Sequence, residues 1–295
     1  MDAEFTEKEY ENPLYLELLA GSPHLWTPSQ VFEEHFGIDA ALEIHLARVW
    51  RLLGYATAPR GAILEDYSWG FVWRRLRGKR LLPGFEVNLL VQAKRTQIMK
   101  NRPAELRKQG LTSPYWRFST KPHQQAALDA VSDRLGNRAA VVYAAGAFGQ
   151  LSELFKYTES GDLVDNSTFV ATRRLSGHEH WVYDQPGCSG FACTSPEPHE
   201  GEPIAAVIER LAGEAEPRGG PDADGTLRAL EYTANQIFQA LDTLPEVGPR
   251  TREFMRLVRE QEPLDAPSLG ERAARAFVQI QLFAVLHQLT WNVVG

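Results

Sequence analysis

Gln92 and Lys94 are the pair of side chains whose types and spacing most suggest chemistry in this sequence. Side chains two residues apart in a β-strand project from the same face, about 6–7 Å from each other along the strand. A carboxylate brought beside this amide and this ammonium would complete a site for a divalent cation and a phosphate. The simpler interpretation, that the strand emerges into solvent at Gln92, stays open.

The residues around this pair have the pattern of a buried strand followed by a crossover. One face of the stretch 85–95 is predicted to carry four apolar side chains, Phe85, Val87, Leu89 and Val91. A helix over 123–135 and a short apolar, β-branched run within 138–148 follow. Strand, helix and strand in this order predict a right-handed crossover and a parallel pair of strands.

Two basic stretches flank the predicted strand. Five of the seven residues from 74 to 80 are cationic: Arg74, Arg75, Arg77, Lys79 and Arg80. A second basic segment begins at Lys94 and Arg95 and runs to Lys108. The first stretch is either a solvated turn or a cationic hairpin tip that contacts phosphates, and the density of charge gives both interpretations equal weight.

The acidic partner depends on a segment that can be read in two ways. Residues 38–46 alternate as in a strand that carries Asp39. Extended to residue 53, the same segment has the apolar stripe of a helix with Asp39 at its N-cap. If the segment is a helix, the candidate carboxylates are Glu43 within that helix and Glu65 or Asp66, which precede the strand of Gln92.

Composition restricts the class of protein. With 43% apolar and 23% charged residues among 295, the chain has the composition of a soluble globular protein. It has no run of about 20 apolar residues, no secretory-signal pattern, and two cysteines, Cys188 and Cys193, too few for a disulfide framework, so we expect a reduced cytosolic protein. The net charge of −7 argues against wholesale coating of nucleic acid and allows a local basic groove.

The common catalytic and nucleotide-binding motifs are missing. The sequence contains no Walker loop, GxGxxG, HExxH or GxSxG. His178 and His180 stand two apart on a predicted strand, but the sequence shows no third metal ligand beside them. The segments 186–190 and 195–198 are expected to be loops.

The C-terminal part is predicted to be helical. Residues 214–225 have the composition of a linker. This linker is predicted to separate an α/β domain, residues 1–213, from a helical region, residues 226–295. Its last helix, 269–292, is apolar nearly all round, which predicts a buried helix or a partner interface. We expect a homodimer with four side chains near the interface, Phe277, Ile280, Phe283 and Leu286; the alternative is that they pack against the helix 226–241.

A family resemblance follows from four motifs taken in order. They are Glu34-His-Phe-Gly-Ile-Asp39-Ala-Ala-Leu42, Gln92-Ala-Lys94-Arg95, Tyr115-Trp-Arg117-Phe118 and Gln124-Gln125-Ala-Ala-Leu128. Together they resemble the PD-(D/E)XK nuclease superfamily in its Q-x-K variant, and uncharacterised bacterial nuclease-like proteins. The resemblance covers about residues 27–200 and departs from the family in the 53 residues between Asp39 and Gln92.

The resemblance implies a fold, a reaction and roles for named residues. The fold would be α/β, with a restriction-endonuclease-like αβββαβ core and a mixed sheet. The reaction would be Mg²⁺-dependent hydrolysis of phosphodiester bonds in DNA, with Mn²⁺ as a substitute metal. The resemblance also implies a role in bacterial genome defence, in which another protein of the defence system would be a partner. The resemblance assigns Asp39, Glu34 and the Gln92 carbonyl to the metal.

Lys94 would orient the attacking water or neutralise the phosphorane. Gln124 would support the site from the following helix. The basic residues, Arg95 among them, would hold backbone phosphates. Two alternative functions stay open. One is a catalytically inactive nuclease-like protein that binds nucleic acid or serves as a subunit of an assembly, and the other is a purely structural partner protein.

Overall fold

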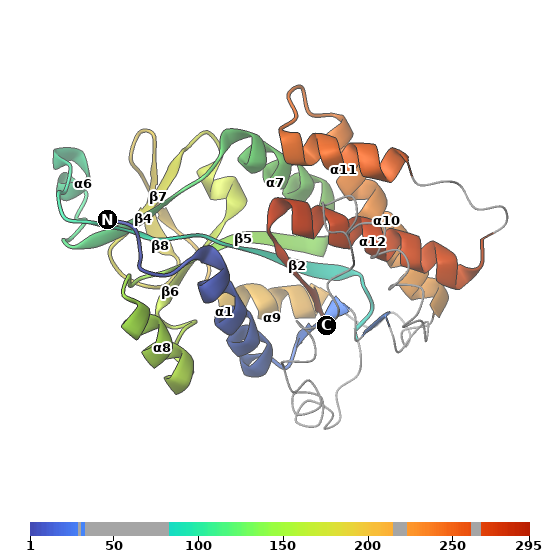
Figure 1. Ribbon diagram of the computed structural model, residues 1–295, viewed down its shortest axis with the longest axis horizontal. Coiled ribbons are helices and arrows are strands. Elements are labelled where there is room, and N and C mark those ends of the chain that lie inside the picture. The colour runs from blue at the N-terminus through green and yellow to red at the C-terminus, as the bar shows by residue number, and fades with distance from the viewer. Residues whose placement is uncertain (29–30, 33–82, 215–222, 261–266) are drawn as a thin grey trace.

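The computed structural model describes residues 1–28, 31–32, 83–214, 223–260 and 267–295 (Figure 1). The predicted acids and the first basic stretch lie outside these ranges; they are Glu34, Asp39, Glu43, Glu65, Asp66, Arg74, Arg75, Arg77, Lys79 and Arg80. Within the described part of the chain, no helix is long and apolar enough to cross a membrane.

A mixed five-stranded sheet is the centre of the α/β fold. Its order is β1 (Leu25–Trp26), β10 (Thr290–Val294), β2 (Val87–Ala93), β5 (Ala139–Gly146) and β6 (Ser167–Ala171). β2 is parallel to β5 and antiparallel to β10. The predicted helix and second strand are confirmed as α7 (Pro122–Leu135) and β5, and β2 and β5 form the predicted parallel pair.

β2 is buried on both faces, which explains its nearly continuous apolar sequence. Val87, Leu89 and Val91 pack in the core formed with α1 (Glu7–Gly21), α8 (Leu151–Ser160) and α9 (Ile204–Glu214). Leu90 faces the core on the α7 side. Phe85 also belongs to that second core, so the prediction that it shares a face with Val87 is wrong. It precedes β2, and the strict alternation begins only at Val87.

The C-terminal region is helical but ends in a strand. Its helices are α10 (Ala223–Asp242), α11 (Pro249–Arg259) and α12 (Leu269–His287), and Figure 1 shows them on the α7 side of the sheet. The prediction of one helix over 269–292 is wrong beyond residue 287. Gln288 adopts a left-handed conformation with φ 58°, which ends the helix. The β-branched and aromatic residues after it enter the sheet as β10.

The side chains predicted at a dimer interface lie inside the subunit. Phe277, Ile280 and Phe283 are each at most 1% exposed. Phe283 lies edge-on to Phe254 of α11, with ring centroids 5.9 Å apart. Leu286 is partly buried and packs against the same core. The assignment of Phe277, Ile280 and Phe283 to a subunit interface is therefore wrong, while that of Leu286 and the homodimer itself stay predictions.

A second, antiparallel sheet lies beyond the ends of β2 and β5. Its order is β3 (Gln97–Met99), β4 (Tyr115–Ser119), β7 (His180–Tyr183), β8 (Ser189–Cys193) and β9 (Glu197–Glu200). The loops predicted at 186–190 and 195–198 are confirmed in their first residues, but each ends in a strand, since β8 begins at Ser189 and β9 at Glu197. Gly190 interrupts the pattern of apolar side chains by which β8 could be recognised in the sequence. A side chain does not fit at this position, because a Cβ there would lie 2.6 Å from the Trp181 ring. The short helix α6 (Ala104–Lys108) connects β3 and β4.

Candidate functional site at the end of β2

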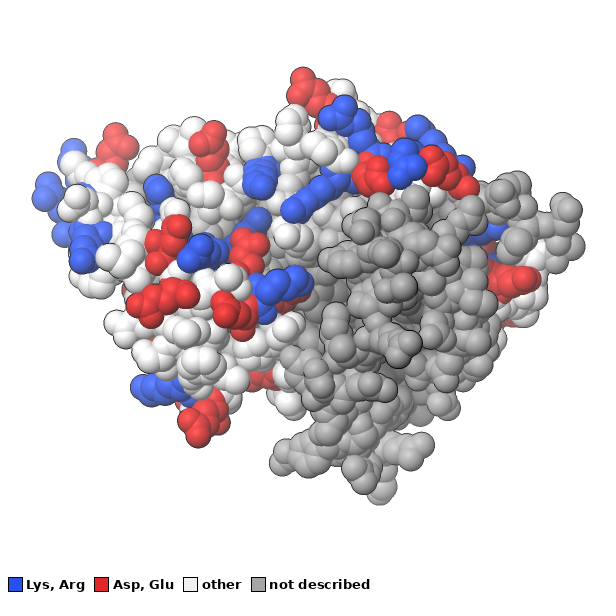
Figure 2. Space-filling model, viewed as in Figure 1, with Lys and Arg blue, Asp and Glu red and all other residues white. Residues whose placement is uncertain are grey.

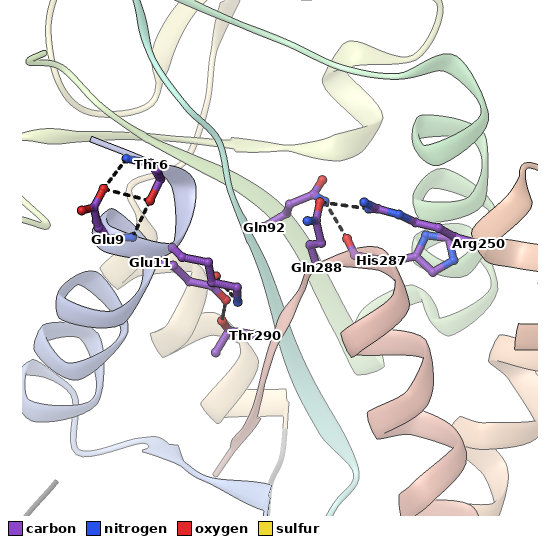
Figure 3. A network of polar contacts seen from close by, with 9 residues as sticks. Thr6, Glu9, Glu11, Gln92, Arg250, His287, Gln288 and Thr290 are labelled. Atoms are coloured by element: carbon purple, nitrogen blue, oxygen red, sulfur yellow. Dashed lines mark hydrogen bonds and ion pairs between the residues drawn. The ribbon is translucent and has the colours of Figure 1, made fainter. Parts of the chain in front are cut away.

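Gln92 and Gln124, predicted to belong to one site, do meet in the structure. Both amides donate a hydrogen bond to the His287 carbonyl oxygen, Gln92 Nε2 at 2.6 Å and Gln124 Nε2 at 2.9 Å. His287 is the last residue of α12, where helix carbonyls lack intrahelical donors. The two glutamines thus hold the end of α12 against β2 and α7, and Figure 3 shows the bond from Gln92.

The carbonyl oxygen of the Gln92 side chain has no hydrogen-bond donor in the part of the chain that the structure describes. Gln92 is 1% exposed, and its Oε1 is buried without a donor among the described residues. A buried acceptor without a donor costs free energy, so such an atom marks a place where a ligand can bind. An amide oxygen suits a hard divalent cation such as Mg²⁺.

Lys94 is a buried cation without a hydrogen bond or ion pair among the residues the structure describes. It is 6% exposed, and its Nζ lies 5.1 Å from the centre of the Tyr143 ring. The ring is fixed by a 2.6 Å hydrogen bond from its hydroxyl to Gln125 Oε1. Desolvation lowers the pKa of Lys94 to about 8; the charge of Glu7 opposes this, and those of Lys121 and Arg250 add to it.

The burial of Lys94 is expected to make the protein more stable as pH rises above about 8. Its pKa is lowered from 10.5 to about 8 in the folded state. Between these values the unfolded chain holds a proton that the folded chain lacks, so the free energy of unfolding increases with pH. The full increase is roughly 3 kcal/mol at about 1.4 kcal/mol per pH unit.

Denaturant titrations at about pH 7.5, 9 and 10.5 measure this increase. The variant Lys94→Met should be more stable than the wild type at the lowest pH and equal to it at the highest. An increase of the same size in the variant would show that another group causes it.

Two further cations surround the same helix end. Arg250, near the start of α11, donates a 2.9 Å hydrogen bond from Nη1 to Gln288 Oε1 (Figure 3). Lys121 is the N-cap of α7. His287 adds no charge at neutral pH, because burial, with a smaller effect of Arg250, lowers its pKa to about 4.

Two described acids near this site, Glu7 and Glu11, come from α1, and they were not among the residues predicted from the sequence. Glu7 Oε1 accepts the Arg95 backbone N–H at 3.3 Å. Glu11 Oε1 accepts the hydroxyl of Thr290 at 2.8 Å (Figure 3). Glu7 and Glu11 are four residues apart, so their positions lie on one face of α1. That spacing in a capped helix was the signal available in the sequence.

The strands beside β2 supply no carboxylate. Its two neighbours are β10, with the sequence TWNVV, and β5, with AAVVYAAG. The part of the chain described by the structure contains no group of three or more His, Cys, Asp or Glu residues able to hold a metal. The carboxylates that remain as candidates for a metal site here are those of α1 and those outside the described residues, Asp39 and Glu34 among them.

The remaining predicted residues have structural partners. Arg95 binds the Ala3 carbonyl through Nε at 3.2 Å and Nη2 at 2.5 Å, which fixes the N-terminal segment beside β3. His178 lies 3.7 Å from a Glu197 oxygen, and His180 Nδ1 lies 2.9 Å from Ser119 Oγ. Neither histidine forms a metal site with the described residues.

A basic surface around α6 was only partly recognised in the sequence. Between residues 94 and 121 the chain has eight Lys or Arg residues and a single acid, Glu105. Figure 2 shows basic side chains gathered at the end of the molecule that α6 occupies in Figure 1. In a chain of net charge −7, this concentration is a local attraction for polyanions.

The chain matches no protein-family model, no curated protein and no solved structure. Its function must therefore be argued from the chemistry of the end of β2.

Proposed function

We propose that this protein is a metal-dependent nuclease that hydrolyses phosphodiester bonds in DNA at the end of β2. The observation that carries the proposal is Lys94, a buried cation with no carboxylate partner among the described residues, next to the unpaired Gln92 oxygen. A preorganised ammonium in a dry site stabilises the negative charge that develops on a phosphate. A solely structural role does not explain why a charge is buried there.

The topology around β2 supports this function. A central strand, antiparallel to one neighbour and parallel to the next through a crossover helix, suits the restriction-endonuclease-like core that the sequence motifs suggest. One difference is that β10, from the end of the chain, occupies the antiparallel position. The acid would then come from another element, with Asp39 and Glu34 as the candidates from the motifs and Glu11 as the candidate from the geometry.

The site has a suitable acceptor for Mg²⁺ or Mn²⁺ in the unpaired Gln92 Oε1. Asp39 and Glu34 would supply the anionic ligands, and a bound metal would lower the pKa of a water molecule and neutralise charge on the phosphate. Lys94 would hold a non-bridging phosphate oxygen, and Tyr143 would fix the direction of its ammonium. The basic surface around α6 would hold the DNA backbone.

A second candidate function is a catalytically inactive nuclease-like subunit that binds nucleic acid or a partner in an assembly. Its support is that Gln92 and Gln124 both fasten the end of α12, which gives both glutamines a structural reason to be present. The lack of a carboxylate on β10 and β5 also fits an inactive site.

Incubation of the purified protein with supercoiled and linear DNA distinguishes the two functions. With Mg²⁺ or Mn²⁺ the nuclease is expected to cut, and EDTA should stop the cutting. Asp39→Ala should abolish cutting without changing the thermal midpoint, since a polar residue of a site rarely stabilises a core. DNA that stays intact with both metals, while still being retarded in a gel, would favour the inactive subunit.

A further inference from the structure

Three cations from different elements lie near the end of α12, and the charges of Lys121 and Arg250 act on Lys94. Lys94 follows Gln92 by two residues, and Lys121 precedes Gln124 by three, while both glutamines bind that carbonyl. Arg250 is bonded to Gln288, the next residue after His287. The same hydrogen bonds that hold the end of α12 therefore bring the three cations to one rim of the site.

Two helix N-termini lie beside each other near this rim. α7 and α11 each begin with a proline at the first turn and lack a side-chain cap. They are adjacent, since a Cβ on Gly248, the N-cap of α11, would lie 3.0 Å from the Cβ of His123. Uncapped N-termini carry partial positive charge and free N–H groups, and they bind anions.

The described residues do not balance the charges at this rim. Within the described ranges, Lys94, Lys121 and Arg250 form no ion pair with a carboxylate, and Glu7 is the acid whose charge acts on Lys94. Lys121 and Arg250 lie at helix N-termini, where a cation is repelled by the helix dipole. Lys94 is 6% exposed and lacks a hydrogen-bond acceptor among the described residues. Such an arrangement is stabilised when an anion enters it.

We propose that Lys94, Lys121 and Arg250, with the N-termini of α7 and α11, bind a terminal phosphate monoester. This rests on the proposed nuclease function in one respect, namely that the phosphate belongs to a DNA end. A phosphodiester carries one negative charge, whereas a monoester carries about 1.5 to 2 near pH 7. Among the described residues, three cations opposed by Glu7 match the larger charge. The site therefore holds a phosphorylated end, the form that a scissile phosphate takes after hydrolysis, more tightly than an internal position of the strand.

The first test measures anion binding without any reaction. Inorganic phosphate is titrated calorimetrically into the full chain in the presence of EDTA. Wild-type protein should bind it, and Arg250→Gln and Lys121→Gln should each weaken binding about tenfold, equivalent to 1.4 kcal/mol. Arg252→Gln, an exposed arginine of the same helix, is the matched control and should bind as the wild type does. Equal affinity in all four proteins, or no binding to the wild type, would overturn the proposal.

The second test uses DNA ends. Linear duplexes with a 5′-phosphate, a 3′-phosphate or only hydroxyl ends are compared for binding in EDTA and for cutting in Mg²⁺. One of the phosphorylated ends should bind at least about tenfold more tightly than the hydroxyl ends, and Arg250→Gln should remove that preference. Preferential binding without cutting would retain the phosphate site and reject the nuclease. Cutting without any end preference would retain the nuclease and reject the phosphate site.

Discussion

Lys94→Met should reduce metal-dependent DNA cleavage by about a hundredfold or more, the usual effect of losing a group that stabilises transition-state charge. Methionine has a similar length and fits an apolar site, so the Tyr143 ring and the surrounding core should keep their packing. Because the buried charge is lost, stability at pH 7 should rise rather than fall. Loss of activity in a more stable protein separates a chemical role of Lys94 from a structural one.

The measurement is the initial rate of cutting at saturating Mg²⁺, together with the midpoint of denaturant unfolding. Lys100→Met provides the control, since Lys100 belongs to the same basic segment and is exposed. It should alter cutting only through weaker binding at high salt. A folded Lys94→Met protein that cuts at the wild-type rate would remove Lys94 from the mechanism.

Phe283→Ala is expected to lower the free energy of unfolding by about 3–5 kcal/mol, the range for truncating a buried phenylalanine. Phe283 is fully buried, and its ring contacts Phe254 and His287. The loss should also loosen the end of α12, to which Gln92 and Gln124 bind. Cutting should therefore become more sensitive to temperature than in the wild type.

The control for this variant is Val285→Ala on the same helix, where the side chain is 46% exposed. It should cost less than about 1 kcal/mol. Light scattering on both variants tests the dimer, because neither substitution should change the mass if subunits meet elsewhere. A dimer that dissociates only in Phe283→Ala would show that α12 contributes to the subunit contact after all.

Elements of the fold could be predicted from the sequence where the periodicity of apolar residues alone decides the structure. The buried strand β2 and the helical spacing of α7 are local patterns, so the parallel unit could be predicted from them. That Gln92 and Gln124 belong to one place was implied only by the family resemblance. The partner that joins these glutamines could not be predicted, because the carbonyl of His287 is a backbone atom far along the chain. A backbone acceptor leaves no signature in residue type.

The predictions that are wrong involve long-range pairing or small residues. β10 was assigned to a helix, because its apolar residues extend the pattern of α12 and only Gln288 marks the break. β8 contains a glycine that packs on Trp181, so its pattern resembles a loop. Glu11 was overlooked, because its link to Thr290 joins opposite ends of the chain.

The position of β10 in the sequence also determines when the five-stranded sheet can be completed during translation. Trp291 donates from Nε1 to Asn88 Oδ1 at 2.8 Å across 203 residues of chain, and β10 separates β1 from β2. On a ribosome, β2 and β5 emerge long before the strand that completes their sheet. One edge of β2 must then wait unpaired, which is a state prone to aggregation and a target for chaperones. The candidate site, which depends on the end of α12, forms only when that strand arrives.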